Sequence, residues 1–292
     1  MQITHKQKNV VGWALRLVIL FACAWFIHAK VDAKWTVSFD QLANNWGVII
    51  IVCVLAVANW GLEVWRWKIS LNVLGSYSWF SAMQQVFGGL TLNWIMPFTS
   101  GDLVARLLPH ANRQEAGVLI FYNRVSMLAI TLVFGGYGIY VFSTDLFESR
   151  GWILGVGLAL VGVGSLLLRY YLRRRDSAVD GWFLLQLIVL SVLRFGVFTF
   201  QFYLLISAFN PELAKTLVLA GVGWTFLFRS IIPSIFGHLG VREVSAMLFF
   251  ETHVSNMLLV LTPSLLIWLI NTVAPSVLGL YFLLKYKVKI AA

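Results

Sequence analysis

Six apolar runs in this sequence are each long enough to cross a lipid bilayer as a helix, and this feature limits the possible folds most. About 20 helical residues span the roughly 30 Å of hydrocarbon in a membrane. The runs cover residues 11–29, 44–65, 115–142, 151–172, 182–208 and 256–284. Only 12% of the residues are charged, about half the share found in soluble domains. The sequence therefore predicts an all-α, polytopic membrane protein with a single integral membrane domain over residues 1–292.

Two further apolar stretches, 79–98 and 215–236, have glycines in the middle and a proline near the end. They fit either a poor membrane-spanning helix or a re-entrant hairpin, because broken backbone at membrane depth is tolerated only inside protein or beside water. The hairpin model places thirteen lysines and arginines, Arg66 among them, on the cytoplasmic side and four outside. This bias follows the positive-inside rule. It favours the hairpin model, with both termini in the cytoplasm.

A repeat with an offset of 136 residues relates the two stretches. Ile95–Arg106 reads IMPFTSGDLVAR and Ile231–Arg242 reads IIPSIFGHLGVR, with Ile, Pro, Gly, Leu and Arg in common. The same offset superimposes the apolar runs, which gives two copies of about 8–142 and 148–287. Each copy would contain three transmembrane helices and a broken re-entrant hairpin. Because three is odd, the second copy has inverted topology, and inverted repeats with broken helices are typical of transporters.

The two repeated motifs have the chemistry of an anion site. A broken helix exposes unpaired N–H groups and the positive end of a helix dipole, which suit phosphate or carboxylate. We expect the breaks at Pro97–Gly101 and Pro233–Gly237, with Arg106 and Arg242 supplying charge. The expected counter-charges are Asp102, Glu115, Glu243 and Glu251. Alternatively, each arginine pairs with a nearby acid and only braces its hairpin; the two roles are compatible.

Three more arginines, Arg124, Arg194 and Arg229, lie deep within apolar runs. A charge at the bilayer centre costs at least about 2.5–3.5 kcal/mol, so each needs a partner or a wet cavity. Glu63 and the four acids named above are possible partners for Arg194. His238 follows the second motif's glycine and titrates near neutral pH in its unperturbed form, so it could couple protons or line the site. We therefore include Arg124, Arg194, Arg229 and His238 among the substrate-binding candidates.

Several classes of function are not expected. The net charge of +10 is explained by cytoplasmic loops and anionic lipid rather than by nucleic acid. Cys23 and Cys53 lie inside apolar runs without any Cys/His spacing, so we predict no metal site and no cofactor. No phosphate-binding loop of an ATPase is present. An integral membrane enzyme that acts on a lipid phosphate through His238 or His253 remains an alternative, as does an accessory protein that moves nothing.

The chain resembles the flippase-like family, which is the transmembrane region of lysylphosphatidylglycerol synthases and their stand-alone relatives. The resemblance rests on NWIMPFTSGDLVARL at 93–107 and IPSIFGHLGVRE at 232–243. One departure is His238, where the family usually has glycine. The aminoacyl transfer of the synthases belongs to a separate soluble domain and is not expected of this chain. The resemblance implies a binding role for Pro97, Gly101, Asp102, Arg106, Pro233, Gly237, Arg242 and Glu243.

The resemblance implies movement of a phospholipid, or of a related anionic or polyprenyl-linked lipid, between leaflets. Together with the repeat, it predicts a lipid flippase of the bacterial inner membrane, with membrane lipids as its partners. The headgroup would lie between the two hairpins, and transport would be downhill or ion-coupled. The sequence leaves the lipid, the direction, the energy source and the oligomeric state open.

Overall fold

The computed structural model describes residues 5–31, 36–94, 96, 100–143, 179–232 and 238–290. These residues are helical without any strand, which confirms the all-α class. The predicted span at 151–172 lies outside the described residues, as do Pro97, Pro233 and Gly237. The elements are α1 (His5–Lys30), α2 (Thr36–Asn44), α3 (Trp46–Leu74), α4 (Trp79–Leu92), α5 (Ser100–Leu107), α6 (Arg113–Ser143), α8 (Gly181–Phe209), α9 (Lys215–Ile231), α10 (Val241–Phe250), α11 (Leu258–Trp268), the π-helical turn η3 (Leu269–Val273) and α12 (Ala274–Ile290).

Four helices are long and apolar enough to span a membrane, and they coincide with four of the six predicted runs. They are α3, α6, α8 and the continuous helix formed by α11, η3 and α12. The outer face of α8 exposes large apolar side chains such as Leu185, Ile188 and Val192, as a lipid-facing surface requires. These observations support a membrane-spanning protein. The predicted run at 11–29 is helical within α1.

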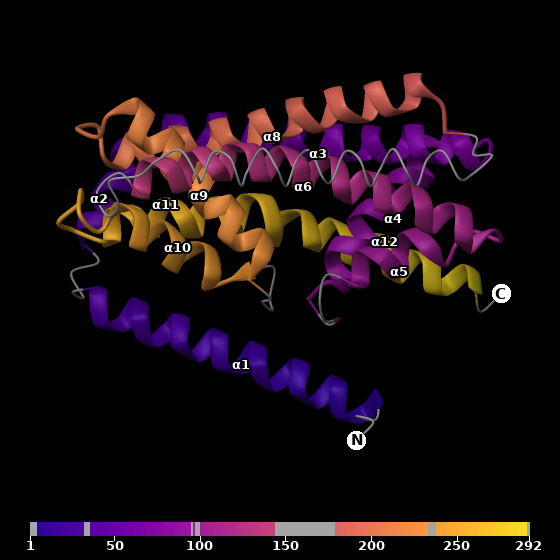
Figure 1. Cartoon of the computed structure of the whole chain (residues 1–292), viewed down its shortest axis with the longest axis horizontal. Coiled ribbons are helices and arrows are strands. Elements are labelled where there is room, and N and C mark those ends of the chain that lie inside the picture. The colour runs from indigo at the N-terminus through magenta and orange to yellow at the C-terminus, as the bar shows by residue number, and fades with distance from the viewer. Residues whose placement is uncertain are drawn as a thin grey trace.

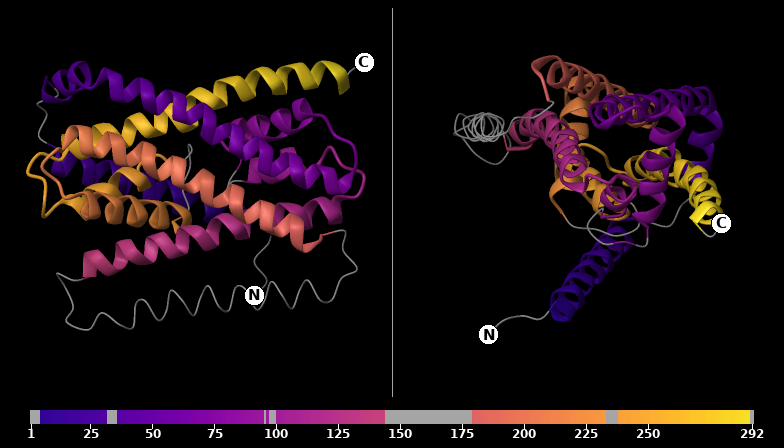
Figure 2. Two further views of the ribbon diagram at one scale, coloured as in Figure 1. Left: turned by 90° about the horizontal axis from the view of Figure 1, so that it is seen from above. Right: turned by 90° about the vertical axis from the view of Figure 1, so that its right-hand side faces the viewer.

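The helices pack in a reciprocal pattern (Figures 1 and 2). Helix α3 lies against α8, α4 packs on α12, and α9 packs on α6. Helices α4 and α9 are the first arms of two helix pairs, α4–α5 and α9–α10. Each of these first arms therefore contacts the final helix of the other half of the chain. Close approach is built into the contacts, because a Cβ at Gly138 or Gly279 would collide with backbone atoms of α9 or α4.

The stretch predicted as the first hairpin forms a helical pair that is longer than expected. The predicted range 79–98 contains only α4 and the turn, whereas the second arm, α5, extends to Leu107 and carries Arg106. Gly89 allows the two arms to touch, since a Cβ there would come within 2.8 Å of the Asp102 Cα. The predicted 215–236 likewise contains only α9 of the pair α9–α10. Figure 1 shows α4 and α5 toward the end where α12 finishes, and α9 and α10 toward the opposite end.

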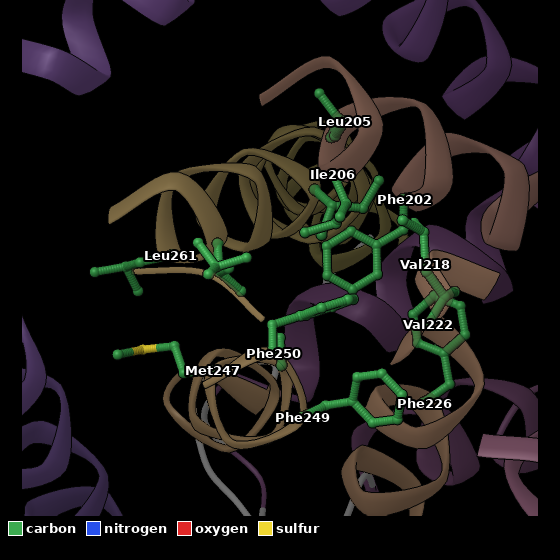
Figure 3. Close-up of a cluster of buried hydrophobic side chains, with 14 of the residues drawn as sticks. Phe202, Leu205, Ile206, Val218, Val222, Phe226, Met247, Phe249, Phe250 and Leu261 are labelled. Carbon is green, nitrogen blue, oxygen red and sulfur yellow. The ribbon is translucent and has the colours of Figure 1, made fainter. Parts of the chain in front are cut away.

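Two hydrophobic clusters form the core. The larger one joins α8, α9, α10 and α11 around Phe202, Phe226 and Phe250 (Figure 3). The smaller one joins α3, α4, α6 and the start of α8 around Trp67 and Leu187. Along α8 the smaller cluster includes Leu190 and the larger one includes Phe195. Arg194 therefore lies where one cluster gives way to the other.

Candidate site: a buried arginine cluster

Glu63 in the middle of α3 is the centre of a charged network. One carboxylate oxygen, Oε2, accepts a hydrogen bond from Arg66 Nη1 at 2.6 Å, and the other, Oε1, accepts one from Arg106 Nη2 at 2.6 Å. Arg194 of α8 approaches the same carboxylate, with its Nε 3.3 Å from Oε2. Glu63 thus joins α3 to α5 and to α8. This agrees with the predicted partnership of Glu63 and Arg194 and adds two arginines to it.

Arg106 is held on all sides. Its Nε donates to Asp102 Oδ1 at 2.7 Å, one helical turn earlier on α5. Its guanidinium lies 4.9 Å from the ring centroid of Trp67. Because both donating edges of the guanidinium already meet carboxylates, these contacts form the brace that the sequence offered as the alternative to anion binding. Asp102 also contacts Arg124 of α6, whose Nη2 lies 3.6 Å from Oδ2.

The start of α5 explains the glycine of the first motif. Gly101 is buried, and a Cβ at this position would collide with the backbone of Leu92 and Asn93 at the end of α4. The Asn93 side chain in turn accepts a hydrogen bond from the Asp102 N–H at 3.0 Å. The glycine is therefore required because the two arms approach closely. Its N–H belongs to the first turn of α5.

The second motif places a similar pair at the start of α10. Arg242 donates to Glu243, and both side chains are buried. The Gly240 N–H donates to Glu243 Oε2 at 2.8 Å, which caps the helix. Gly240 has a φ of 87° and His238 a φ of 67°. A positive φ favours glycine, so His238 occupies the kind of backbone position where the resemblance led us to expect glycine.

Arg229 lies near the end of α9, and its guanidinium sits 5.4 Å from the ring centroid of Phe198 on α8. The strongest charges acting on Arg229 are those of Arg242 and Arg194, with Glu243 weaker. Arg229, Arg242 and His238 also interact electrostatically. The charge of Arg194, which contacts Glu63, therefore also acts on Arg229.

Two predicted counter-charges lie outside this cluster. Glu115 is exposed in the first turn of α6, where the helix dipole stabilises a carboxylate. Glu251 is exposed and pairs with Lys30 at the end of α1. His253, the other histidine considered, is exposed and contacts Thr252. All three residues lie at helix ends, outside the cluster. Neither glutamate therefore balances the charge of the buried arginines.

The sequence predicted Arg66 in a cytoplasmic loop, and this prediction is wrong: Arg66 is buried within α3. Its Nη2 donates to the Asn123 carbonyl at 2.7 Å and to Ser126 Oγ at 3.1 Å, both on α6. The spacing of Glu63 and Arg66 was the available signal, because residues three apart share a helix face. The predicted span ended at 65, so the pair was divided between membrane and loop.

The cluster carries more positive than negative charge. It contains Arg66, Arg106, Arg124, Arg194, Arg229 and Arg242 against Glu63, Asp102 and Glu243, an excess of three positive charges. Three buried Nε groups, on Arg66, Arg194 and Arg242, have no hydrogen-bond acceptor among the described residues. The same part of the chain contains no group of acidic, histidine or cysteine side chains that could hold a metal ion. An excess of positive charge is an arrangement that suits an anionic ligand rather than a cation.

No protein-family model matches this sequence, and no curated protein matches it. The resemblance drawn from residues 93–107 and 232–243 accordingly remains an expectation about function.

Proposed function

We propose that this protein binds the anionic headgroup of a membrane lipid at the arginine cluster and moves the lipid between leaflets. The observation that carries the proposal is an excess of two positive charges among the buried and half-buried groups of an apolar helical body, where the five arginines other than the exposed Arg124 face three acids. Arginine stays protonated in proteins, so this excess cannot be removed by proton loss. An anion that enters the cluster would offset part of this excess, and in a membrane the abundant anions are lipid headgroups.

The arrangement of the two helix pairs supports transport rather than simple binding. In the proposed topology α4–α5 and α9–α10 are re-entrant hairpins of two inverted repeats, and the N- and C-termini are cytoplasmic in a bacterial inner membrane. The reciprocal packing of α4 on α12 and α9 on α6 is what a pseudo-two-fold relation would produce. Each hairpin would then close the site toward one leaflet, so that rocking of one half against the other gives alternating access.

The test is leaflet exchange of fluorescent lipids in vesicles that contain the purified protein. Anionic phosphatidylglycerol and zwitterionic phosphatidylcholine would be compared, each with Arg242→Ala and with Arg113→Ala as the matched control. Arg113 is an exposed arginine at the start of α6. We expect the protein to accelerate exchange of the anionic probe, the Arg242→Ala variant to lose most of this acceleration, and the control to keep it. Exchange no faster than in empty vesicles, for either lipid, would contradict the proposal.

A further inference from the structure

The six arginines of the cluster differ in whether they donate to a carboxylate. This difference indicates where in the cluster an anion would bind. Arg66, Arg106 and Arg242 each donate to a carboxylate. Arg229 has neither a hydrogen bond nor a carboxylate within 4.0 Å among the described residues. Arg194 is intermediate: its Nε lies near Glu63, but Glu63 already accepts two shorter hydrogen bonds.

Arg194 and Arg229 both lie next to Phe198 of α8, whose surroundings we call the seam, and Arg194 also contacts Glu63 and Trp60 of α3. Phe198 lies one helical turn after Arg194 on α8, so the two share a face. The Phe198 ring is stacked on Phe226 of α9 at 4.5 Å, and the guanidinium of Arg229, three residues after Phe226, lies over the same Phe198 ring. Two cations therefore line one seam, and only one of them has a carboxylate nearby.

Additional donors at this seam lack acceptors. Arg194 lies over Trp60, 5.6 Å from its ring centroid. The Trp60 Nε1 and the Arg194 Nε are both buried without an acceptor in the part of the chain that the structure describes. Buried donors are almost always satisfied, and leaving one unpaired is unfavourable. Two guanidinium cations, one of which has a buried Nε that makes no hydrogen bond although Glu63 Oε2 lies 3.3 Å away, and the unpaired Trp60 N–H indicate a ligand that offers several acceptor oxygens and negative charge.

From these observations we infer that Arg194 and Arg229, with the Trp60 N–H, form the seat for the phosphate of a diacyl phospholipid, while Arg106 braces α5 and does not touch the ligand. The inference rests on the proposed function and assigns its headgroup site. Planar guanidinium groups bind phosphate oxygens in pairs. The lipid, rather than a soluble phosphate, is favoured because Val192 and Leu193, directly before Arg194 on α8, expose about half of their apolar surface. Acyl chains can therefore lie along α8 while the phosphate reaches the seam.

The experiment is native mass spectrometry of the delipidated protein in detergent, titrated with phosphatidylglycerol, with a diacylglycerol of the same chains, and with glycerol 3-phosphate. The variants are Arg229→Gln, Arg229→Lys, Arg106→Gln and the exposed control Arg113→Gln, each with its melting temperature. We expect Arg229→Gln to weaken phosphatidylglycerol binding at least tenfold without lowering the melting temperature, and Arg229→Lys to restore part of it. Arg106→Gln should lower the melting temperature because it removes the charge-assisted hydrogen bonds of Arg106 to Glu63 and Asp102, and the folded fraction should bind as the wild type does.

Each other outcome has a definite meaning. Wild-type binding of phosphatidylglycerol that Arg229→Gln leaves unchanged would overturn the seat while leaving the proposed function intact. If phosphatidylglycerol binding by the folded fraction of Arg106→Gln falls as far as that of Arg229→Gln, the conclusion that Arg106 braces α5 without touching the ligand would be overturned. Equal affinity for glycerol 3-phosphate would support the phosphate seat but overturn the lipid as its ligand, and equal affinity for diacylglycerol would overturn the phosphate itself. No saturable binding of any probe by the wild type would overturn the seat together with the proposed function.

Discussion

Glu63→Gln is the substitution for which the structure predicts the largest loss of stability. The Glu63 carboxylate accepts two hydrogen bonds of 2.6 Å from Arg66 and Arg106. Each charge-assisted hydrogen bond contributes about 1.5–3 kcal/mol, and removing one partner of a buried ion pair costs about 3–5 kcal/mol. The second figure applies because Glu63, Arg66 and Arg106 are 7%, 1% and 4% exposed. Glutamine keeps one acceptor oxygen but turns an NH2 group toward a guanidinium, so we expect about 3–5 kcal/mol.

The assay is reversible unfolding in mixed micelles, titrated with a denaturing detergent and followed by tryptophan fluorescence. Glu115→Gln is the matched control, because this exposed glutamate has no buried partner and should change stability by at most about 0.5 kcal/mol. The double variant Glu63→Gln/Arg106→Gln should lose less than the sum of the two single variants, since removing both charges leaves fewer unpaired groups. A loss below about 1 kcal/mol, or strict additivity in the double variant, would refute the reasoning that Glu63 anchors α5 to α3.

Three further predictions concern backbone and protonation. Gly101→Ala should destabilise the fold strongly or prevent folding because a Cβ there would collide with the end of α4, whereas Gly136→Ala on α6, with open space around it, should raise the unfolding free energy by about 0.5–1 kcal/mol. His238→Gly should raise the melting temperature, because glycine adopts the φ of 67° without the steric cost that histidine bears. His110 lies in the loop before α6, where it contacts the Tyr77 hydroxyl, and burial lowers its pKa below the ordinary 6.5. The unfolded chain therefore binds a proton that the folded chain excludes, so the contribution of His110 to stability is complete above about pH 6.5 and falls as pH decreases. His110→Gln should flatten the pH dependence of the melting temperature between about pH 7 and pH 5. An unchanged slope would contradict this prediction.

Long-range pairing is the part of the site that sequence reasoning could not supply. The depth of Arg194 and its need for a partner followed from hydropathy alone, and Glu63 was a possible partner. The sequence could not show that Arg66 and Arg106 share the same carboxylate, because Glu63 and Arg106 are 43 residues apart. It favoured Arg106 and Arg242 as the arginines that hold the anion, with Arg229 only as a further candidate. Only the packing of α8 against α9 distinguishes the paired arginines from Arg229.

Hydropathy and the proline and glycine positions were sufficient to predict the helices, the four long apolar spans and the two interrupted stretches, because membrane insertion acts on local composition and backbone breaks act on local geometry. The bounds of the helix pairs were less predictable, since α5 and α10 are short and their charged residues resemble those of a loop. Which arginine meets which acid, and which of them is left without a partner, was decided only by the tertiary structure. Those pairings depend on how helices distant in sequence approach one another, as α6 approaches α9 at Gly138 and α12 approaches α4 at Gly279.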